Sequence, residues 1–150
     1  MPTWHKGTIQ YQREEIVTDK RGDQIKLKTI TEQYLIDAVS YTEAEARLYK
    51  EVATNTPNFS VKNISPVRLA DVFCHDTGDA WFKCKVVYLT EDDRGRQRRI
   101  VNSMLVNAQN AKEAYERIQD SLKTMLIPIE IEDVVKTKIL DVFPYREEAA

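Results

Sequence analysis

Residues 34–48 read YLIDAVSYTEAEARL, and residues 104–118 read MLVNAQNAKEAYERI. At this spacing of 70 positions five pairs of residues are identical, and most other pairs keep their chemical character. Similarity within one chain at a fixed spacing is the sequence signature of a repeated structural unit. The stretch therefore predicts a tandem duplication. The identical pairs are Leu35 with Leu105, Ala38 with Ala108, Glu43 with Glu113, Ala44 with Ala114 and Arg47 with Arg117.

The similarity extends outward from this stretch in both directions. Toward the C-terminus, LADVF at 69–73 matches ILDVF at 139–143 with the same spacing of 70. Toward the N-terminus, WHKGTIQYQ at 4–12 matches WFKCKVVYL at 81–89 with a spacing of 77. The seven extra residues of the first copy fall between Tyr11 and Leu35, where a hairpin connection tolerates added length.

Each copy has the pattern of a β-β-α-β unit. Alternating, strand-forming sequence at 4–12 and 81–89 precedes a polar, glycine-containing turn and a second strand at 26–38 or 98–108. A capping box then predicts the start of a helix, formed by Ser40 with Glu43 or by Asn110 with Glu113. A third strand follows, and we expect it to run continuously through 59–73 and through 129–143.

The fold class predicted is therefore α+β, with helices packed on mainly antiparallel sheet. We expect a first repeat at 1–73, a linker at 74–80, a second repeat at 81–145 and a C-terminal tail at 146–150. The two copies would share one sheet or face each other across a pseudo-twofold axis, since a three-stranded sheet with one helix is a thin core. Phe73 and Phe143 would anchor the core at the ends of the third strands. The helical faces expected to be buried are Ala44, Leu48 and Val52 in the first copy and Ala111, Ala114, Tyr115, Ile118 and Leu122 in the second.

The composition is that of an ordinary globular protein, with 42% hydrophobic residues, 31% charged residues and a net charge of −2. No apolar run is long enough to span a bilayer, and the N-terminus has no apolar signal core. The two cysteines, Cys74 and Cys84, favour a reducing compartment. We therefore expect a cytoplasmic protein without a membrane partner.

The residues give little support for catalysis. His5 and His75 are the two histidines, neither lies in a nucleophile motif, and no Gly-rich phosphate-binding fingerprint is present. Cys74, His75 and Cys84 do not have the spacing of a zinc site, which shows two close ligand pairs. We predict a non-catalytic protein with no metal or other cofactor.

The chain also resembles a known family. The Trp-x-Lys spacing at 4–6, the segment YLIDAVSYTEAEAR and the DVFPY sequence at 141–145 are similar to the uncharacterised DUF4494 family. The resemblance runs from Trp4 to Tyr145. It implies a setting in Bacteroidota and their phages or mobile elements, hence the host cytoplasm if phage-encoded, with replication, host take-over or counter-defence as roles. It implies no established activity.

The basic hairpins suggest a nucleic-acid partner. Cationic side chains surround the turn of each copy, and nearby aromatic rings can stack with bases. Acidic neighbours such as Glu14, Glu15 and Asp93 weaken the field, and cations at hairpins also serve solubility. The leading expectation is binding of single-stranded DNA or RNA. The residues expected to carry it are Lys20, Arg21, Lys26, Lys28, Arg94, Arg96, Arg98, Arg99, Tyr11 and Tyr88.

Protein interaction is the alternative. Pro66 within 60–69 lacks a backbone donor and predicts an edge position for its strand, whereas the matching stretch 130–139 has no proline and is available for pairing. The partner would be a host or phage protein, or a second copy in a homodimer, bound at a sheet edge or at the C-terminal DVFPYREE. A small-molecule pocket between the copies is a third possibility.

Overall fold

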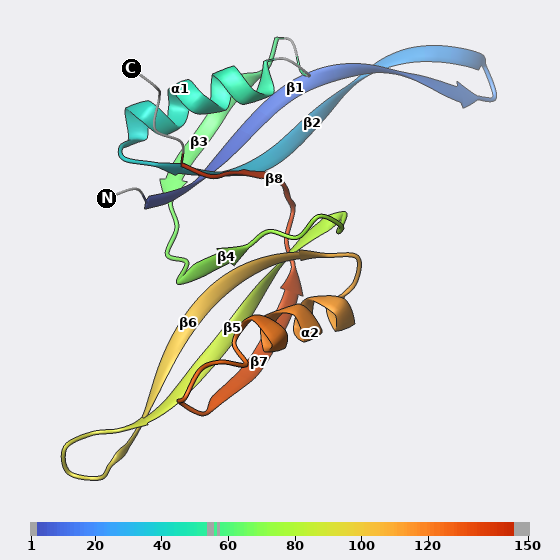
Figure 1. Cartoon of the computed structure of the whole chain (residues 1–150). Coiled ribbons are helices and arrows are strands. Elements are labelled where there is room, and N and C mark those ends of the chain that lie inside the picture. Colours follow the sequence, from blue (N-terminus) through green and yellow to red (C-terminus); the bar gives the residue numbers. More distant parts are fainter. Residues whose placement is uncertain (1–2, 54–55, 57, 146–150) are drawn as a thin grey trace. The chain divides into compact units, whose positions relative to one another are not determined.

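The computed structural model describes residues 3–53, 56 and 58–145, and these form an α+β protein (Figure 1). The chain divides into two compact units. Unit 1 consists of residues 1–67 and 140–150, and unit 2 of residues 68–139. Within the described ranges the elements are β1 (Thr3–Asp19), β2 (Gly22–Ala38), α1 (Tyr41–Val52), β3 (Ser60–Pro66), β4 (Asp71–Phe73), β5 (Ala80–Glu91), β6 (Gln97–Ala108), α2 (Ala111–Ser121), β7 (Ile129–Lys136) and β8 (Ile139–Phe143).

Unit 1 is a four-stranded sheet with strand order β3-β1-β2-β8, and α1 packs on it. β1 and β2 are long strands in which apolar and polar residues alternate. They pair antiparallel along their whole length, and the turn between them consists of Lys20 and Arg21. Gly22 adopts a φ of 99°, a left-handed conformation that glycine enters without steric cost. The core lies between sheet and helix, where Ile9, Ile36 and Leu48 are fully buried.

Unit 2 repeats this plan with strand order β4-β6-β5-β7 and with α2 packed on its sheet. The β5–β6 and β5–β7 pairs are antiparallel, and β4 pairs parallel with β6, so the sheet is mixed. Cys84, Val86, Val106 and Ile118 are fully buried in its core. Burial raises the pKa of the Cys84 thiol to about 11, so this cysteine acts as a small apolar core residue.

The Asp-Val-Phe segments lie on strands of their own, which corrects the prediction of one continuous third strand. β3 ends at Pro66 and β7 ends at Lys136. The chain then leaves the sheet that it has just built: β4 joins β6 of unit 2, and β8 lies beside β2 of unit 1. Each repeat therefore supplies the fourth strand of the other unit's sheet.

This exchange also changes the domain boundaries. The predicted division at 1–73 and 81–145 follows the repeats, whereas the compact units divide after Val67 and after Ile139. Residues 74–80, expected to link the copies, lie inside unit 2. The two copies do not share one sheet in the described residues, since β1 and β5 belong to separate sheets.

The exchanged phenylalanines pack as core residues, as predicted, but each does so in the unit that its repeat does not otherwise build. Phe143 packs against the core of unit 1 and stacks on Tyr34 with ring centroids 5.6 Å apart. Phe73 packs against the core of unit 2. In each segment the aspartate accepts a hydrogen bond from the next backbone N–H, at 2.9 Å in Asp71 and 2.8 Å in Asp141.

Fine structure agrees with the sequence alignment of the two units. Each sheet has a register shift in its edge pair, between Thr8 and Ile9 in unit 1 and between Lys85 and Val86 in unit 2. The alignment at a spacing of 77 places these bulges at the same point. A bulge inserts one extra residue into one strand and is a specific feature rather than a defect. The matching bulges support the interpretation of a duplication.

Each helix begins as predicted. The Ser40 Oγ accepts from the Glu43 N–H at 3.2 Å, and the Asn110 Oδ1 accepts from the Glu113 N–H at 2.8 Å. An arginine in the middle of each helix donates to a residue near the end of the second strand: Arg47 to the Asp37 carbonyl at 2.9 Å, and Arg117 to the Asn107 carbonyl at 2.6 Å. These charged hydrogen bonds tie the helix to the sheet.

The residues after the exchanged strands are held by side chains from the second strands. Asn107 accepts from the His75 backbone N–H at 2.7 Å and donates to the His75 carbonyl at 2.8 Å. In unit 1 the equivalent residue is Asp37, whose carboxylate accepts from the Tyr145 backbone N–H. Burial raises the pKa of Asp37 above its ordinary value in spite of this bond.

Candidate functional site

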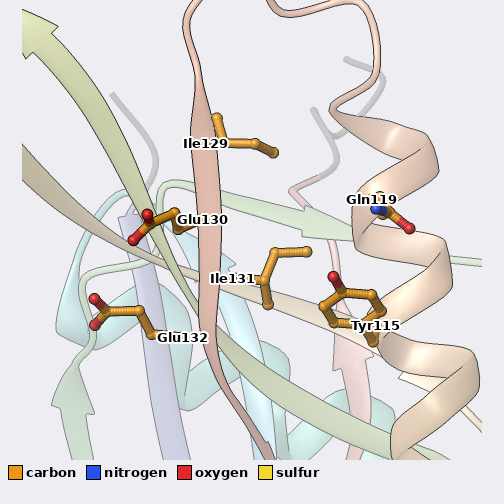
Figure 2. A pocket seen from close by; sticks show the side chains of 6 residues that line it. All are labelled: Tyr115, Gln119, Ile129, Glu130, Ile131 and Glu132. Atoms are coloured by element: carbon orange, nitrogen blue, oxygen red, sulfur yellow. The ribbon is translucent and has the colours of Figure 1, made fainter.

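An open groove lies between α2 and β7 in unit 2. It has a volume of about 410 Å³ and is lined by Tyr115 and Gln119 of the helix and by residues 129–132 of the strand. Figure 2 shows Ile129 and Ile131 pointing from β7 toward the helix, and Glu130 and Glu132 pointing away from it. β7 is the last strand of its sheet, so the groove runs along a strand whose outer edge has no neighbour among the described residues.

Tyr115 differs from the sequence prediction. The helical pattern placed it with Ala114 and Ile118 on the buried face, but 41% of its surface is exposed. Ala111 is exposed as well. Ala114, Ile118 and Leu122 form the buried face instead. The tyrosine ring thus stands beside the core and forms one wall of the groove.

Unit 1 fills the equivalent space with aromatic rings. The alignment of the repeats places Tyr49 opposite Gln119 and Phe59 opposite Ile129. Tyr49 and Phe59 stack on each other with ring centroids 5.2 Å apart and an interplanar angle of 30°. Aromatic stacking of this kind adds roughly 0.5–1.5 kcal/mol beyond the buried area. The two units therefore differ in whether the helix and the third strand are joined by side chains.

The connection from α2 to β7 adds exposed apolar surface beside the groove. Met125 and Ile127 are each 40% exposed, and Leu126 is fully exposed. The aligned residues of the first repeat read NTP at 55–57, a polar sequence. Exposed apolar residues that gather beside a groove are typical of an interaction surface.

The edge strand β7 carries acidic side chains in two different states. Glu132 is the extra residue of the bulge and pairs with Lys85 at 3.3 Å and with Arg99. Glu130 is exposed and forms no ion pair with the described residues, since its neighbour on β5 is Val87. β7 thus carries Glu132, which is neutralised, Glu130, which has no ion pair among the described residues, and Asp133, which lies opposite Lys85 on β5.

The first basic hairpin is a two-stranded arm. Beyond Gln10, β1 pairs only with β2 in the described residues. The arm explains the seven extra residues, because this hairpin has 17 cross-strand pairs and a two-residue turn, whereas the β5–β6 hairpin has 12 pairs and a five-residue turn. Its charges are balanced, with five basic and five acidic residues between positions 10 and 32.

The predicted phosphate-binding residues of this arm do not form one cluster. Lys20 and Arg21 are exposed at the turn, and Lys26 lies on β2 opposite Glu15. Lys28 pairs with Glu15 at 3.5 Å, in competition with Arg13 at 3.0 Å. Opposed charges on neighbouring strands stabilise the arm and leave a weak net field.

In the second hairpin, Asp92 at the turn contacts the backbone of two arginines and the side chain of a third. The Asp92 Oδ1 accepts from the backbone N–H groups of Arg94 at 2.9 Å and Arg96 at 2.8 Å, while Arg98 approaches its carboxylate at 3.9 Å. Arg99 is drawn to Glu132 on β7. The side chains of Arg94 and Arg96 are exposed and have no ion pair in the described part of the chain.

Neither Tyr11 nor Tyr88, the two tyrosines expected to stack with bases, is a freely exposed side chain. Tyr11 is half-buried against the core of unit 1 and donates to the Glu32 carboxylate at 2.5 Å, which raises the pKa of the phenol. Tyr34 donates to the other oxygen of the same carboxylate at 2.7 Å. Tyr88 packs against the core of unit 2, and burial raises its pKa.

Two of the other expectations concern features that would be absent, and a third concerns the C-terminal tail. Over residues 3–53, 56 and 58–145, no three His, Cys, Asp or Glu side chains gather as metal ligands would. The same residues include no helix of the length and apolar character that a membrane crossing requires. The C-terminal tail at 146–150, part of one predicted binding segment, lies outside the described residues.

The sequence reading missed Tyr115, Gln119, Ile129 and Ile131 as site residues. The signal was present in the repeat alignment, because the aromatic pair of the first copy is replaced by glutamine and isoleucine in the second. The edge positions of β3 and β7, in contrast, were predicted correctly from Pro66 and its counterpart.

The chain thus consists of two similar β-β-α-β units, and the sheet of each unit receives its fourth strand from the other repeat. The units differ in the groove of unit 2. The chain belongs to the family described as "Domain of unknown function (DUF4494)", whose match covers residues 3–145. This confirms the resemblance seen in the sequence. A comparison with curated proteins finds no match.

Proposed function

We propose that this protein is a non-catalytic interaction module that binds an extended segment of a host or phage protein at the edge of β7. The observation that carries the proposal is the open groove of about 410 Å³ between α2 and this edge strand. An edge strand offers unpaired backbone N–H and C=O groups, to which an extended peptide adds as a further strand. Every second side chain of such a peptide then points into the groove.

The corresponding edge strand in unit 1, β3, differs from β7 in two ways. There the Tyr49–Phe59 stack occupies the same position, and Pro66 removes a donor from the edge strand. A peptide that adds to the edge in unit 2 has the groove for its side chains, whereas in unit 1 the stacked rings lie at the aligned position. We therefore propose the site in unit 2 alone.

The test transfers the closed arrangement of unit 1 into unit 2. Peptides are selected from a displayed random library on the wild-type chain, and their affinity is measured for the double variant Gln119→Tyr with Ile129→Phe. We expect at least a tenfold loss of affinity, since the rings fill the groove. The matched control is Tyr49→Gln with Phe59→Ile, which alters unit 1 only and should leave the affinity within about twofold of the wild type.

Amide hydrogen exchange locates the peptide. Binding should slow exchange at outward-pointing amides of β7 and leave β3 unchanged. If the library yields no enriched peptide, or if the enriched peptides bind the double variant as well as the wild type, the proposal is wrong.

Binding of single-stranded DNA or RNA is a second candidate, and the arginines at the tip of the β5–β6 hairpin favour it. The exposed Arg94 and Arg96 lack ion pairs within the described ranges and suit contacts to phosphate. The engaged tyrosines and the paired Lys28, Arg98 and Arg99 count against a larger surface.

A labelled oligothymidylate measured at two salt concentrations separates the candidates. Phosphate binding predicts a salt dependence that falls when Arg94→Ala and Arg96→Ala are combined, by roughly 0.7 in the logarithmic slope for each lost contact. Arg98→Ala, which removes a cation already facing Asp92, is the control. Absence of binding at low salt would rule out this second function.

A further inference from the structure

We infer that the segment bound at β7 alternates apolar and basic side chains, with apolar residues facing α2 and a lysine or arginine opposite Glu130. This inference rests on the proposed peptide-binding function and names the chemistry of its partner. It follows from the two faces of β7 and from the pairing state of each carboxylate.

The inner face of the strand selects apolar residues. Ile129 and Ile131 point toward the helix, and Tyr115 forms the opposite wall (Figure 2). In a pleated sheet, directly opposed residues of neighbouring strands project from the same face. Peptide residues opposite the two isoleucines therefore enter the groove, where apolar side chains gain most from leaving water.

The outer face selects a cation opposite Glu130. Glu130 lies between the two isoleucines and points away from the helix, so the peptide residue opposite it projects from that same face. Its neighbour within the sheet is Val87, which supplies no charge. Glu132 is already neutralised by Lys85 and Arg99. One basic residue between two apolar ones therefore matches the strand, since opposite charges on adjacent strands attract.

The same charges argue against a second copy of this chain as the occupant. Edge-to-edge pairing of two β7 strands would bring Glu130 and Asp133 of one copy near those of the other. Like charges on directly opposed positions of a sheet are destabilising. Acidic residues on an edge strand thus repel a sister strand and accept a basic one.

The experiment compares the consensus of library-selected peptides between the wild-type chain and Glu130→Lys. On the wild type we expect apolar residues at alternate positions with lysine or arginine between them. On the variant we expect the basic preference to disappear or to become acidic, and the wild-type peptides to bind about three- to tenfold more weakly. Ser60→Lys, at the aligned position of unit 1, is the matched control and should change neither result.

The outcomes separate this inference from the function on which it rests. Peptides that depend on the open groove but show no basic preference, or that bind Glu130→Lys unchanged, overturn the inference and leave the groove intact as a site. Failure of the library to yield groove-dependent peptides overturns both. Sedimentation of the wild-type chain adds one check, because dimers that dissociate in Glu130→Lys or in the groove-filled variant would identify a second copy as the occupant and contradict the inference.

Discussion

Unit 1 and unit 2 have the same order of elements, the same N-cap hydrogen bonds and the same bulge, yet one joins its helix to its third strand by stacked rings and the other does not. In unit 1 the rings of Tyr49 and Phe59 stack across this space. In unit 2, Gln119 and Ile129 leave a groove. The comparison teaches that two side chains at aligned positions distinguish a space closed by stacked rings from an open groove on the same order of elements.

The largest difference that we predict between the cores lies at Gly7 and its counterpart Cys84. A Cβ added at Gly7 would lie 2.8 Å from Leu48 Cδ2 and 3.1 Å from Ile36 Cδ1. In unit 2 the residues aligned with Leu48 and Ile36 are Ile118 and Val106, which pack in one core with Cys84, and we attribute the space for the cysteine to these two changes. Gly7→Cys should therefore lower the free energy of unfolding by about 2–3 kcal/mol, as overpacking does, measured by urea denaturation.

A double-mutant cycle sharpens this comparison. Leu48→Ile transfers the partner that unit 2 uses, so the combined variant Gly7→Cys with Leu48→Ile should lose less stability than the two single changes together. We expect a favourable coupling of at least about 0.5 kcal/mol for residues in direct contact. Strict additivity would show that the two cores do not differ for the reason given.

The next largest predicted loss of stability concerns Arg117 and Arg47, which connect each helix to its sheet. Arg117 donates to the carbonyls of Asn107 and Thr77 at 2.6 and 2.5 Å and pairs with Glu113 at 3.0 Å. Arg47 donates to the Asp37 carbonyl and approaches Glu51 at 3.9 Å. Hydrogen bonds from charged groups contribute about 1.5–3 kcal/mol. Arg117→Ala should cost roughly 2 kcal/mol and Arg47→Ala roughly half of that, and equal losses in thermal unfolding would refute the distinction.

The smallest predicted change in stability concerns Asp37, near the end of β2, and it depends on pH. Burial raises the pKa of Asp37 above its ordinary value of 3.8, so the charged form is disfavoured in the folded state. Stability from this group is present in acid and is lost as pH rises through the raised pKa. Asp37→Asn removes the penalty and copies Asn107 of unit 2. At pH 7 it should stabilise the protein by about 0.5–1 kcal/mol.

The pH profile is the control for this prediction. The gain of Asp37→Asn over the wild type should shrink toward zero as the pH falls below about 4. The reciprocal change Asn107→Asp should destabilise unit 2 at neutral pH, because a carboxylate would face the His75 carbonyl in place of the amide that now donates to it. A stabilisation by Asp37→Asn that is independent of pH would contradict the assigned cause.

Much of each unit could be predicted from local sequence. Hairpins, helix starts and the edge position of β3 follow from alternation, from Ser40 and Asn110 as N-caps and from Pro66, because these features act on neighbouring residues. The positive φ of Gly22 and Gly95 at the turns follows in the same way. The repeat alignment added the equivalence of Arg47 and Arg117.

The exchange of the fourth strands could not be predicted from the same signals. Asp-Val-Phe has identical sequence in both copies, so nothing local says which of two similar sheets it joins. The groove was missed for a related reason, since a helical pattern assigns Tyr115 to the buried face without knowing where the edge of the sheet ends. Pairing between distant segments depends on the whole chain.

The strand exchange is the central structural claim, and hydrogen exchange in Phe143→Ala tests it most directly. Phe143 belongs to the second repeat by sequence but packs on Tyr34 in unit 1. The substitution should cost roughly 2 kcal/mol for a half-buried ring and accelerate amide exchange in β1, β2 and α1, while β5, β6 and α2 keep their protection. Phe73→Ala should give the mirror-image result. Loss of protection in β5, β6 and α2 on substitution of Phe143 would contradict the exchange.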